Sequence, residues 1–198
     1  MVHRWVHRSA LVATAFLVLA CDPSASVSDA LGPWQARPFD GLDRGLAASA
    51  EATCRERTPQ SAGLTLVLHD QRGRGIDTVV FAGPTDQATC QVSKGADGAV
   101  TFLTGGASSG APAEMPGPLG LLVDSMGSSS GSNVETVTEI LGRTGAGVVA
   151  VRILLSDGNE VLATTSNGWF YAWWPGDATA ASLSGDDATG RMVVTVTP

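Results

Sequence analysis

The sequence predicts a mainly β protein with a minor helical part, built as a β-sandwich or a barrel-like fold. Short segments rich in β-branched and aromatic residues follow one another through most of the chain, and turn signals separate them every eight to twelve residues. That spacing is typical of sandwiches and small barrels. One helical pattern precedes these strands, so the expected fold is a β module with a single N-terminal helix.

Residues 1–20 are expected to be a signal peptide. Arg4 and Arg8 form a basic start, and a mostly apolar run of twelve residues extends from Ser9 to Ala20. A transmembrane helix needs about 20 apolar residues, whereas an export signal needs a run of this shorter length. We therefore expect an exported protein and leave this segment out of the fold.

The end of this run, "VLAC" (residues 18–21), resembles the lipobox of bacterial lipoproteins. The resemblance implies that cleavage follows Ala20 and that Cys21 carries a thioether-linked diacylglycerol. Two or three acyl chains hold a protein firmly at a membrane surface, at about 0.8 kcal/mol for each buried CH₂ group. The expected location is the outer face of the cytoplasmic membrane, in the cell envelope. The alternative is an ordinary secretory peptide in which Cys21 has no role.

Without the signal peptide, the remaining 178 residues hold 10 basic and 19 acidic side chains, a formal net charge of −9. Binding to nucleic acid or to an anionic lipid surface requires clusters of Lys and Arg. The charge balance therefore argues against both kinds of partner, and contact with the membrane is expected through the lipid alone.

Cys54 and Cys90 are the only cysteines after Cys21, and we expect them to form a disulfide because the extracytoplasmic compartment is oxidising. Closing a loop of this length stabilises a fold by roughly 3–4 kcal/mol in the chain-entropy model. The alternatives are a metal site or a reactive thiol. His69 is the only histidine of the mature chain, which gives little support to either, and no metal or cofactor is expected.

Residues 21–39 are rich in Ser, Ala and Pro and are expected to form a lipidated, flexible tether. Residues 40–57 are predicted to form a helix, capped by Asp40 and carrying an apolar stripe of Leu42, Leu46 and Ala50. Because Cys54 lies near its end, the disulfide would attach this helix to the strand that carries Cys90.

The helix and a first group of strands make up an N-terminal β lobe, residues 40–104. Its first strand, residues 64–69, places Leu64, Leu66 and Leu68 on one face. Its other strands are expected at residues 77–82, 88–93 and 99–104. Residues 105–118 are expected to be a Gly/Ala/Ser/Pro linker.

Residues 119–198 are expected to form a C-terminal β lobe, with a flexible loop at 127–133 and a strand at 149–155 whose alternate residues point inward. The segments 81–98 and 171–190 share an aromatic-Ala pair, an Ala-Thr pair and a Gly/Asp turn. Two related β lobes would explain this similarity, and coincidence among common turn residues is the alternative.

The segment from "GRTG" (residues 142–145) to "WWPG" (residues 173–176) resembles part of uncharacterised actinobacterial exported proteins. It covers about a fifth of the chain. The resemblance implies an exported β fold and carries no activity.

Two Gly-x-Ser-x-Gly matches, "GASSG" (residues 106–110) and "GSSSG" (residues 127–131), are interpreted as loops. A nucleophile elbow requires a strand before it, a helix after it and a histidine later in the chain. His69 precedes both matches, so no catalytic residue is assigned and the protein is not expected to be an enzyme.

The most aromatic segment, "WFYAWW" (residues 169–174), is predicted to be a strand whose alternate side chains point to opposite faces. Core packing explains at least one face, and Trp169, Trp173 and Trp174 are the candidate binding residues if the other is exposed. We expect a lipid-anchored β module that binds a protein, glycan or other envelope component. An envelope enzyme that uses unidentified acidic residues and a sensory or regulatory ectodomain are the alternatives.

Overall fold

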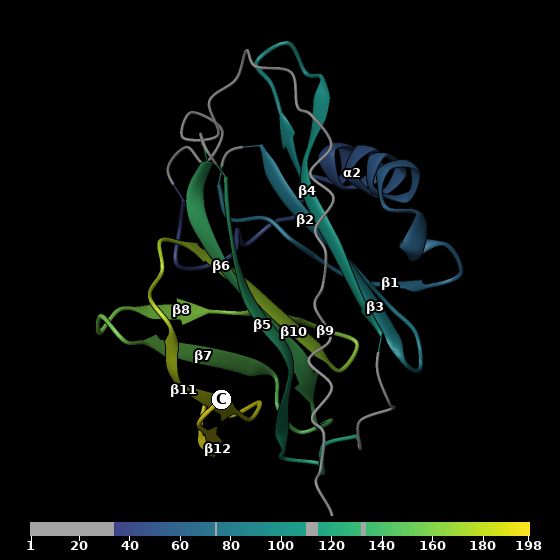
Figure 1. Ribbon diagram of the computed structural model, residues 1–198. Helices are drawn as coiled ribbons and strands as arrows, with labels where there is room; N and C mark the ends of the chain where they lie inside the picture. The colour runs from purple at the N-terminus through teal and green to yellow at the C-terminus, as the bar shows by residue number, and fades with distance from the viewer. Residues whose placement is uncertain (1–33, 74, 110–114, 132–133) are drawn as a thin grey trace, which may run out of the picture.

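A computed structural model describes residues 34–73, 75–109, 115–131 and 134–198 (Figure 1). The helical part consists of α2 (Arg44–Arg57) and the short 3₁₀ helix η1 (Pro59–Ser61). The first six strands are β1 (Thr65–Asp70), β2 (Ile76–Ala82), β3 (Asp86–Lys94), β4 (Val100–Ser109), β5 (Leu121–Gly131) and β6 (Val134–Thr144). The last six are β7 (Ala150–Leu155), β8 (Glu160–Leu162), β9 (Thr164–Ser166), β10 (Trp169–Pro175), β11 (Ala180–Asp186) and β12 (Met192–Val196).

The strands form three antiparallel sheets of four strands each, which confirms the predicted mainly β class. Sheet A has the order β1-β2-β3-β4, sheet B has β5-β6-β10-β9, and sheet C has β12-β11-β7-β8. Figure 1 shows α2 on the outer side of sheet A, and sheet B between sheets A and C. The described residues thus form a stack of one α-helix and three sheets, one sheet more than a simple sandwich.

The helix packs on sheet A through a small apolar core that contains the disulfide. Leu46, Ala50 and Cys54 of α2 meet Val79 and Phe81 of β2 in this core. Cys54 and Cys90 are joined, with their Cα atoms 5.7 Å apart, so the expected disulfide to the sheet is confirmed. Figure 1 shows the helix lying along sheet A at this position.

The N-terminus of α2 lies three residues later than the sequence indicated. Asp43, not Asp40, is the capping residue, and its carboxylate accepts hydrogen bonds from the backbone N–H groups of Gly45 and Leu46 at 3.0 Å each. Leu42 therefore lies outside the helix and is 47% exposed. The apolar stripe begins at Leu46 because only residues after the cap have helical geometry.

The first strand also departs from simple alternation. A bulge between Leu66 and Leu68 interrupts the pairing of β1 with β2. Leu66 packs toward α2, whereas Val67 and Leu68 both enter the core between sheets A and B. An extra residue in one strand shifts the following side chains to the opposite face, which is why Leu64, Leu66 and Leu68 do not share one side.

An apolar core lies on each face of sheet B, and the aromatic strand β10 contributes side chains to both cores. Tyr171 and Trp173 pack against sheet A, whereas Phe170, Ala172 and Trp174 pack against sheet C. The predicted alternation of this strand is confirmed. Because both faces are covered, β10 is a central strand of the molecule.

The chain passes from sheet C to sheet B within the segment 160–166. β8 pairs with β7 in sheet C, and β9 pairs with β10 in sheet B. A two-residue turn then returns the chain into β10: Asn167 and Gly168 have positive φ angles of 52° and 78°. Asn-Gly is the preferred pair for such a hairpin turn because both residues tolerate this conformation.

Residues 34–39, the described part of the expected tether, contact the folded sheets. The Trp34 indole Nε1 donates a hydrogen bond to the backbone oxygen of Trp173 at 3.1 Å. Backbone hydrogen bonds also join Gln35 and Phe39 to the segment that follows β1, and Leu162 to Ala36. These residues belong to the folded unit, so a tether would end before Trp34.

The expected linker and the expected loop are shorter than the sequence suggested. Residues 105–109 continue β4, and residues 127–131 continue β5. The similar segments 81–98 and 171–190 are not equivalent in the fold. β2 and β3 are neighbours in sheet A, whereas β10 and β11 lie in different sheets, so the structure does not contain two related lobes built from this repeat.

Candidate functional site

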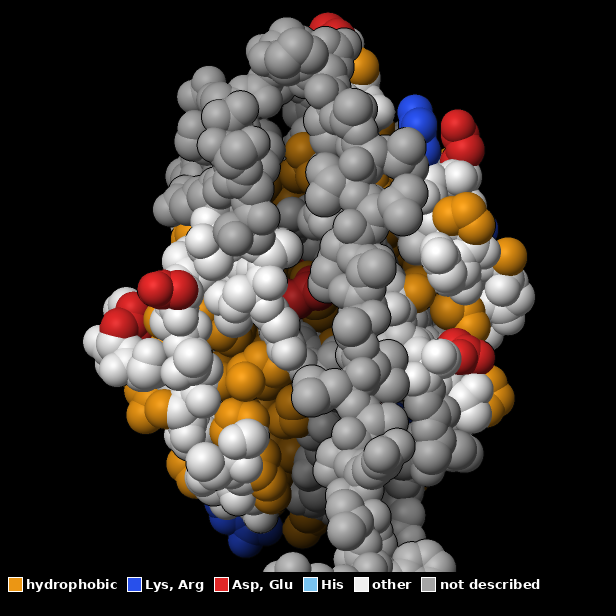
Figure 2. Space-filling view, viewed as in Figure 1, with side chains coloured by type: hydrophobic (Ala, Val, Ile, Leu, Met, Phe, Trp, Pro, Cys, Tyr) orange, Lys and Arg blue, Asp and Glu red, His pale blue; other side chains and the backbone are white. Residues whose placement is uncertain are grey.

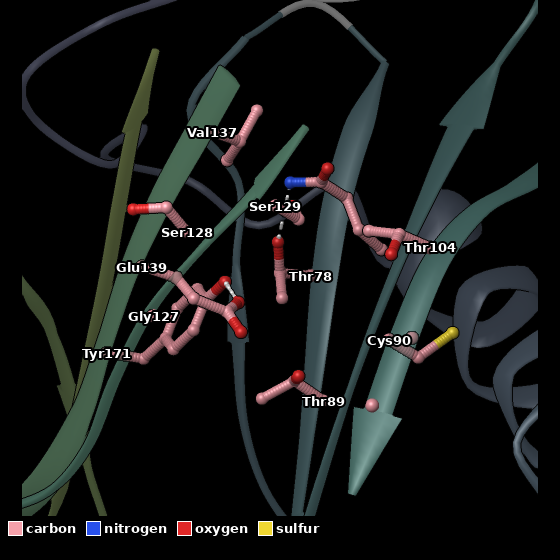
Figure 3. Close-up of a pocket in the computed structure, with 13 residues that line it drawn as sticks. Thr78, Thr89, Cys90, Thr104, Gly127, Ser128, Ser129, Val137, Glu139 and Tyr171 are labelled. Carbon is pink, nitrogen blue, oxygen red and sulfur yellow. Dashed lines mark hydrogen bonds between the residues drawn. The ribbon is translucent and has the colours of Figure 1, made fainter. Parts of the chain in front are cut away.

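A cleft of about 80 Å³ lies between sheets A and B, on the side where strands β4 and β5 form the sheet edges (Figure 3). Four Ser or Thr side chains face it, those of Thr78, Thr89, Thr104 and Ser129, whereas the Ser128 hydroxyl lies on the other face of sheet B and bonds to Thr138. Glycines from β4 and β5 complete its walls, and Tyr171 and Glu139 lie on the sheet B side. The cleft therefore offers several hydrogen-bonding groups on walls whose accessible surface is mostly apolar.

The Gly/Ser-rich walls are strands because their partners are strong β formers. Gly127 and Ser128 pair with Glu139 and Thr138 of β6, and Gly106 pairs with Thr89 of β3. Gly and Ser have weak β propensity, but an existing strand beside them provides the backbone hydrogen bonds and fixes their register. The small side chains leave space between the sheets that larger residues would fill.

Glu139 is the acidic residue of the cleft, and its position follows from the register of β6. Val137, Glu139 and Leu141 alternate onto the face of sheet B that meets sheet A, and both apolar neighbours are buried. Glu139 thus occupies a core-facing position at the place where the two sheets separate. Figure 3 shows its carboxyl group pointing into the space between them.

Tyr171 holds this carboxyl group in place. Its hydroxyl donates a hydrogen bond to Glu139 Oε2 at 2.7 Å, and the tyrosine side chain is buried. Burial raises the pKa of Glu139 above its ordinary value, and the hydrogen bond from Tyr171 opposes that rise in part. Burial, followed by the nearby Glu139 charge, raises the pKa of Tyr171 well above its ordinary value, so the phenol stays neutral.

Sheet A provides the opposite wall, with one internal hydrogen bond. The Gln91 amide Nε2 donates to the Thr78 hydroxyl at 3.2 Å. Figure 3 shows the sulfur of Cys90 directed away from the cleft, toward the helix. The disulfide therefore supports the wall from behind and does not itself face the cleft.

The candidate aromatic residues do not form a binding surface. Trp173 is 0% exposed and Trp174 is 1% exposed, because sheets A and C cover the two faces of β10. Trp169 is half-buried, and the Arg143 guanidinium lies 5.7 Å from its ring centroid. The expectation of a binding surface on Trp173 and Trp174 is wrong for this structure. Cys21, the expected lipidation site, lies outside the described residues.

A second, more open hollow of about 280 Å³ lies where β1 and β9 meet the segment before α2. His69 lines it, and the Nδ1 atom of His69 lies 3.0 Å from Asp77 Oδ2. Gln71 links this pair to the helix, because its Nε2 donates to Asp77 and its Oε1 accepts from the backbone N–H of Asp43. His69 is therefore a paired, largely buried residue that supports the start of α2, and its partner is Asp77 rather than its neighbour Asp70.

The sequence analysis missed Glu139 and the glycine and serine residues of the cleft. The available signal for Glu139 was an acidic residue between Val137 and Leu141 in a segment rich in β-branched residues. The signal for the walls was the pair of Gly/Ser segments beginning at Gly106 and Gly127, which were interpreted as loops. Their position on two facing sheet edges depends on tertiary structure and is absent from local patterns.

Within the ranges that the structure describes, no helix is long and apolar enough to cross a membrane. The same ranges contain no group of three His, Cys, Asp or Glu side chains placed to hold a metal ion.

Comparisons with known proteins give no relative for this chain. No family model matches it, and neither a curated protein nor a solved structure is significantly similar.

Proposed function

We propose that the protein is a lipid-anchored, non-enzymatic binding module on the outer face of the cytoplasmic membrane, and that the cleft between sheets A and B is its binding site. The observation that carries this proposal is the cleft itself, in which hydroxyl groups from two sheets surround one partly buried carboxyl group. Binding pockets place a few polar groups at fixed positions on rigid elements, and strands of two sheets meet that requirement here.

Two features support export and anchoring. The "VLAC" segment provides a lipidation site at Cys21, and the Cys54–Cys90 disulfide is consistent with an oxidising compartment. The folded unit includes Trp34, so residues 22–33 separate it from the lipid. A module held in this way would present its cleft to envelope components.

Anchoring is tested by fractionating cells that express the full chain or its Cys21→Ala variant. The unchanged chain should be in the membrane fraction, and either Cys21→Ala or an inhibitor of the lipoprotein signal peptidase should change its processing and its membrane retention. Cys54→Ala is the matched control, because it removes a cysteine downstream of the lipidation site. Equal membrane retention of the Cys21→Ala variant would contradict anchoring.

Binding at the cleft is tested by NMR on the purified mature chain against a library of small polar compounds. Ligands should shift the backbone signals of Thr78, Gln91 and Glu139 more than those of the outer strand β12. Gly127→Val should abolish these shifts, because a Cβ atom at Gly127 meets no atom within 4 Å and its side chain would enter open space at the cleft.

Gly41→Val is the matched control. Gly41 also has nothing within 4 Å of its Cβ position and lies outside the cleft, in the segment before α2. Its variant should bind as the unchanged chain does. Ligand shifts that persist in Gly127→Val, or that lie away from the cleft, would overturn the proposed binding site.

A further inference from the structure

The structure points to a cationic ligand: we propose that the cleft binds a primary ammonium group, with the Glu139 carboxylate as its counter-ion and the surrounding hydroxyl groups as its hydrogen-bond acceptors. This inference rests on the proposed binding function and names the chemical class of its ligand. A compact ammonium group donates three hydrogen bonds without a fixed planar geometry, which suits a small cleft that presents oxygen atoms on both walls.

The Glu139 carboxyl group has only one of its two oxygen atoms in a hydrogen bond with the described residues. Oε2 accepts the Tyr171 hydroxyl at 2.7 Å, and Oε1 accepts no hydrogen bond from the described residues. The carboxyl group faces the cleft (Figure 3). Removing a carboxylate from water is costly unless it is paired, and an ammonium group in the cleft would give the partly buried Glu139 a counter-charge and a second donor.

The charge of the cleft walls also favours a cation over an anion. Among the described residues that line the cleft, Glu139 is the only carboxyl group and none is Lys or Arg. The remaining polar groups are hydroxyls, an amide and backbone, which are neutral at physiological pH. An anionic ligand would meet the Glu139 carboxyl group without a compensating cation, so the wall chemistry disfavours phosphates and carboxylates.

The charge of the whole molecule favours a cation as well. The mature chain carries a formal net charge of −9, and acidic side chains are spread more widely than basic ones on the face shown in Figure 2. A negative field raises the local concentration of cations and speeds their association. The global charge and the local carboxyl group therefore favour the same sign of ligand.

The volume of the cleft limits what can enter. About 80 Å³ of space is enough for several water molecules, at roughly 10–15 Å³ each, and therefore for an ammonium group with the first carbons of its chain. A single carboxylate is also a poor site for a divalent cation, since Ca²⁺ takes 6–8 oxygen ligands and usually more than one carboxylate.

The test uses three probes of equal length on the purified mature chain: 1,5-diaminopentane, 5-amino-1-pentanol and 1,5-pentanediol. NMR titration should place the first two at Thr78, Gln91 and Glu139 with millimolar dissociation constants, and the diol should cause no saturable shift there. Potassium chloride at the same ionic strength controls for non-specific charge effects. Equal binding of diol and diamine would overturn the ammonium assignment and leave a binding cleft, so the two proposals fail separately.

Glu139→Gln keeps the shape of the side chain and its acceptor for Tyr171 while removing the charge. It should weaken binding of the diamine about ten- to hundredfold, the usual loss when a charged hydrogen-bond partner is made neutral. Glu160→Gln, at an exposed position of strand β8, removes the same charge elsewhere and should leave the affinity within about twofold.

Matching NMR spectra of Glu139→Gln and the unchanged chain would show that the variant is folded. If diamine affinity is unchanged in Glu139→Gln, if potassium competes as well as the diamine, or if none of the amines binds, the ammonium assignment is wrong. A Glu139→Gln chain that does not fold would leave Gly127→Val as the second variant, which keeps the carboxylate and should lose amine binding by filling the cleft.

Discussion

Arg72 and Asp70 form a fully buried ion pair at the junction of the N-terminal segment with sheets A and B. The Arg72 Nε atom donates to Asp70 Oδ2 at 2.7 Å, and Nη2 donates to Oδ1 at 2.9 Å, while both side chains are 0% exposed. Arg72 also donates to the backbone oxygen atoms of Ala36 and Tyr171, and Thr164 donates to Asp70. One pair of charges thus links β1, β9, β10 and the segment before α2.

Arg72→Met should therefore lower the free energy of unfolding by about 3–5 kcal/mol, because it leaves the Asp70 carboxylate buried without a counter-ion. Urea denaturation of the purified chain measures this loss. Arg57→Met is a suitable control, since the Arg57–Glu56 pair is exposed at the end of α2 and should contribute at most about 1 kcal/mol.

The double variant Asp70→Leu/Arg72→Met should be more stable than Arg72→Met alone, since it removes the orphaned charge together with its partner. If the double variant loses as much unfolding free energy as the two single variants lose together, the two residues act independently and do not stabilise the fold as a pair.

The disulfide gives a second prediction. Replacing Cys54 and Cys90 together by Ala should lower the free energy of unfolding by roughly 3–4 kcal/mol, for the loop of 36 residues that the bond closes. Both cysteines are buried, so thiol reagents should label neither residue in the folded, non-reduced protein. Peptide mapping under non-reducing conditions checks the pairing, and free thiols at both positions would contradict it.

Because the pKa of Glu139 is raised, the free energy of unfolding should depend on pH in a direction that can be derived. Below the ordinary Glu pKa, both the folded and the unfolded chain hold this proton, and the group contributes nothing to stability. As pH rises, the unfolded chain releases the proton first, so the folded chain is progressively destabilised until its own higher pKa is passed. Tyr171, which faces Glu139, stays neutral across this range because its pKa is also raised.

Glu139→Gln removes this titration. The stability of the variant relative to the unchanged chain should therefore increase between pH 4 and pH 7, and urea denaturation at both pH values measures the change. If the difference in the free energy of unfolding between Glu139→Gln and the unchanged chain is constant with pH, or decreases between pH 4 and pH 7, the carboxyl group is not held in a desolvated site.

The sequence predicted those features that depend on local chemistry. The alternation of residues 169–174 and the Cys54–Cys90 pairing follow from neighbouring residues or from the small number of cysteines. The cleft does not, because Gly127 and Ser128 became wall residues only through pairing with β6. Likewise Arg72 lies in a Gly-rich segment that is typical of an exposed turn, and its burial depends on Asp70, Ala36 and Tyr171.

The buried tryptophans of β10 give the last prediction, since the two differ at one atom. Trp174 Nε1 donates to the backbone oxygen of Ala178 at 2.7 Å, whereas Trp173 Nε1 is buried and has no partner among the described residues. Both side chains are almost completely buried, so replacing either by Phe removes a similar volume from the core.

Trp174→Phe should consequently destabilise the protein by about 1–3 kcal/mol more than Trp173→Phe. The first variant loses a hydrogen bond and leaves the Ala178 oxygen unsatisfied, and the second removes a donor that is already unsatisfied. Urea denaturation of the two variants at one pH gives the comparison directly. Equal losses would mean that the Trp173 indole N–H has a partner in the native protein, and a larger loss for Trp173→Phe would mean that this partner contributes more than the Ala178 oxygen does to Trp174.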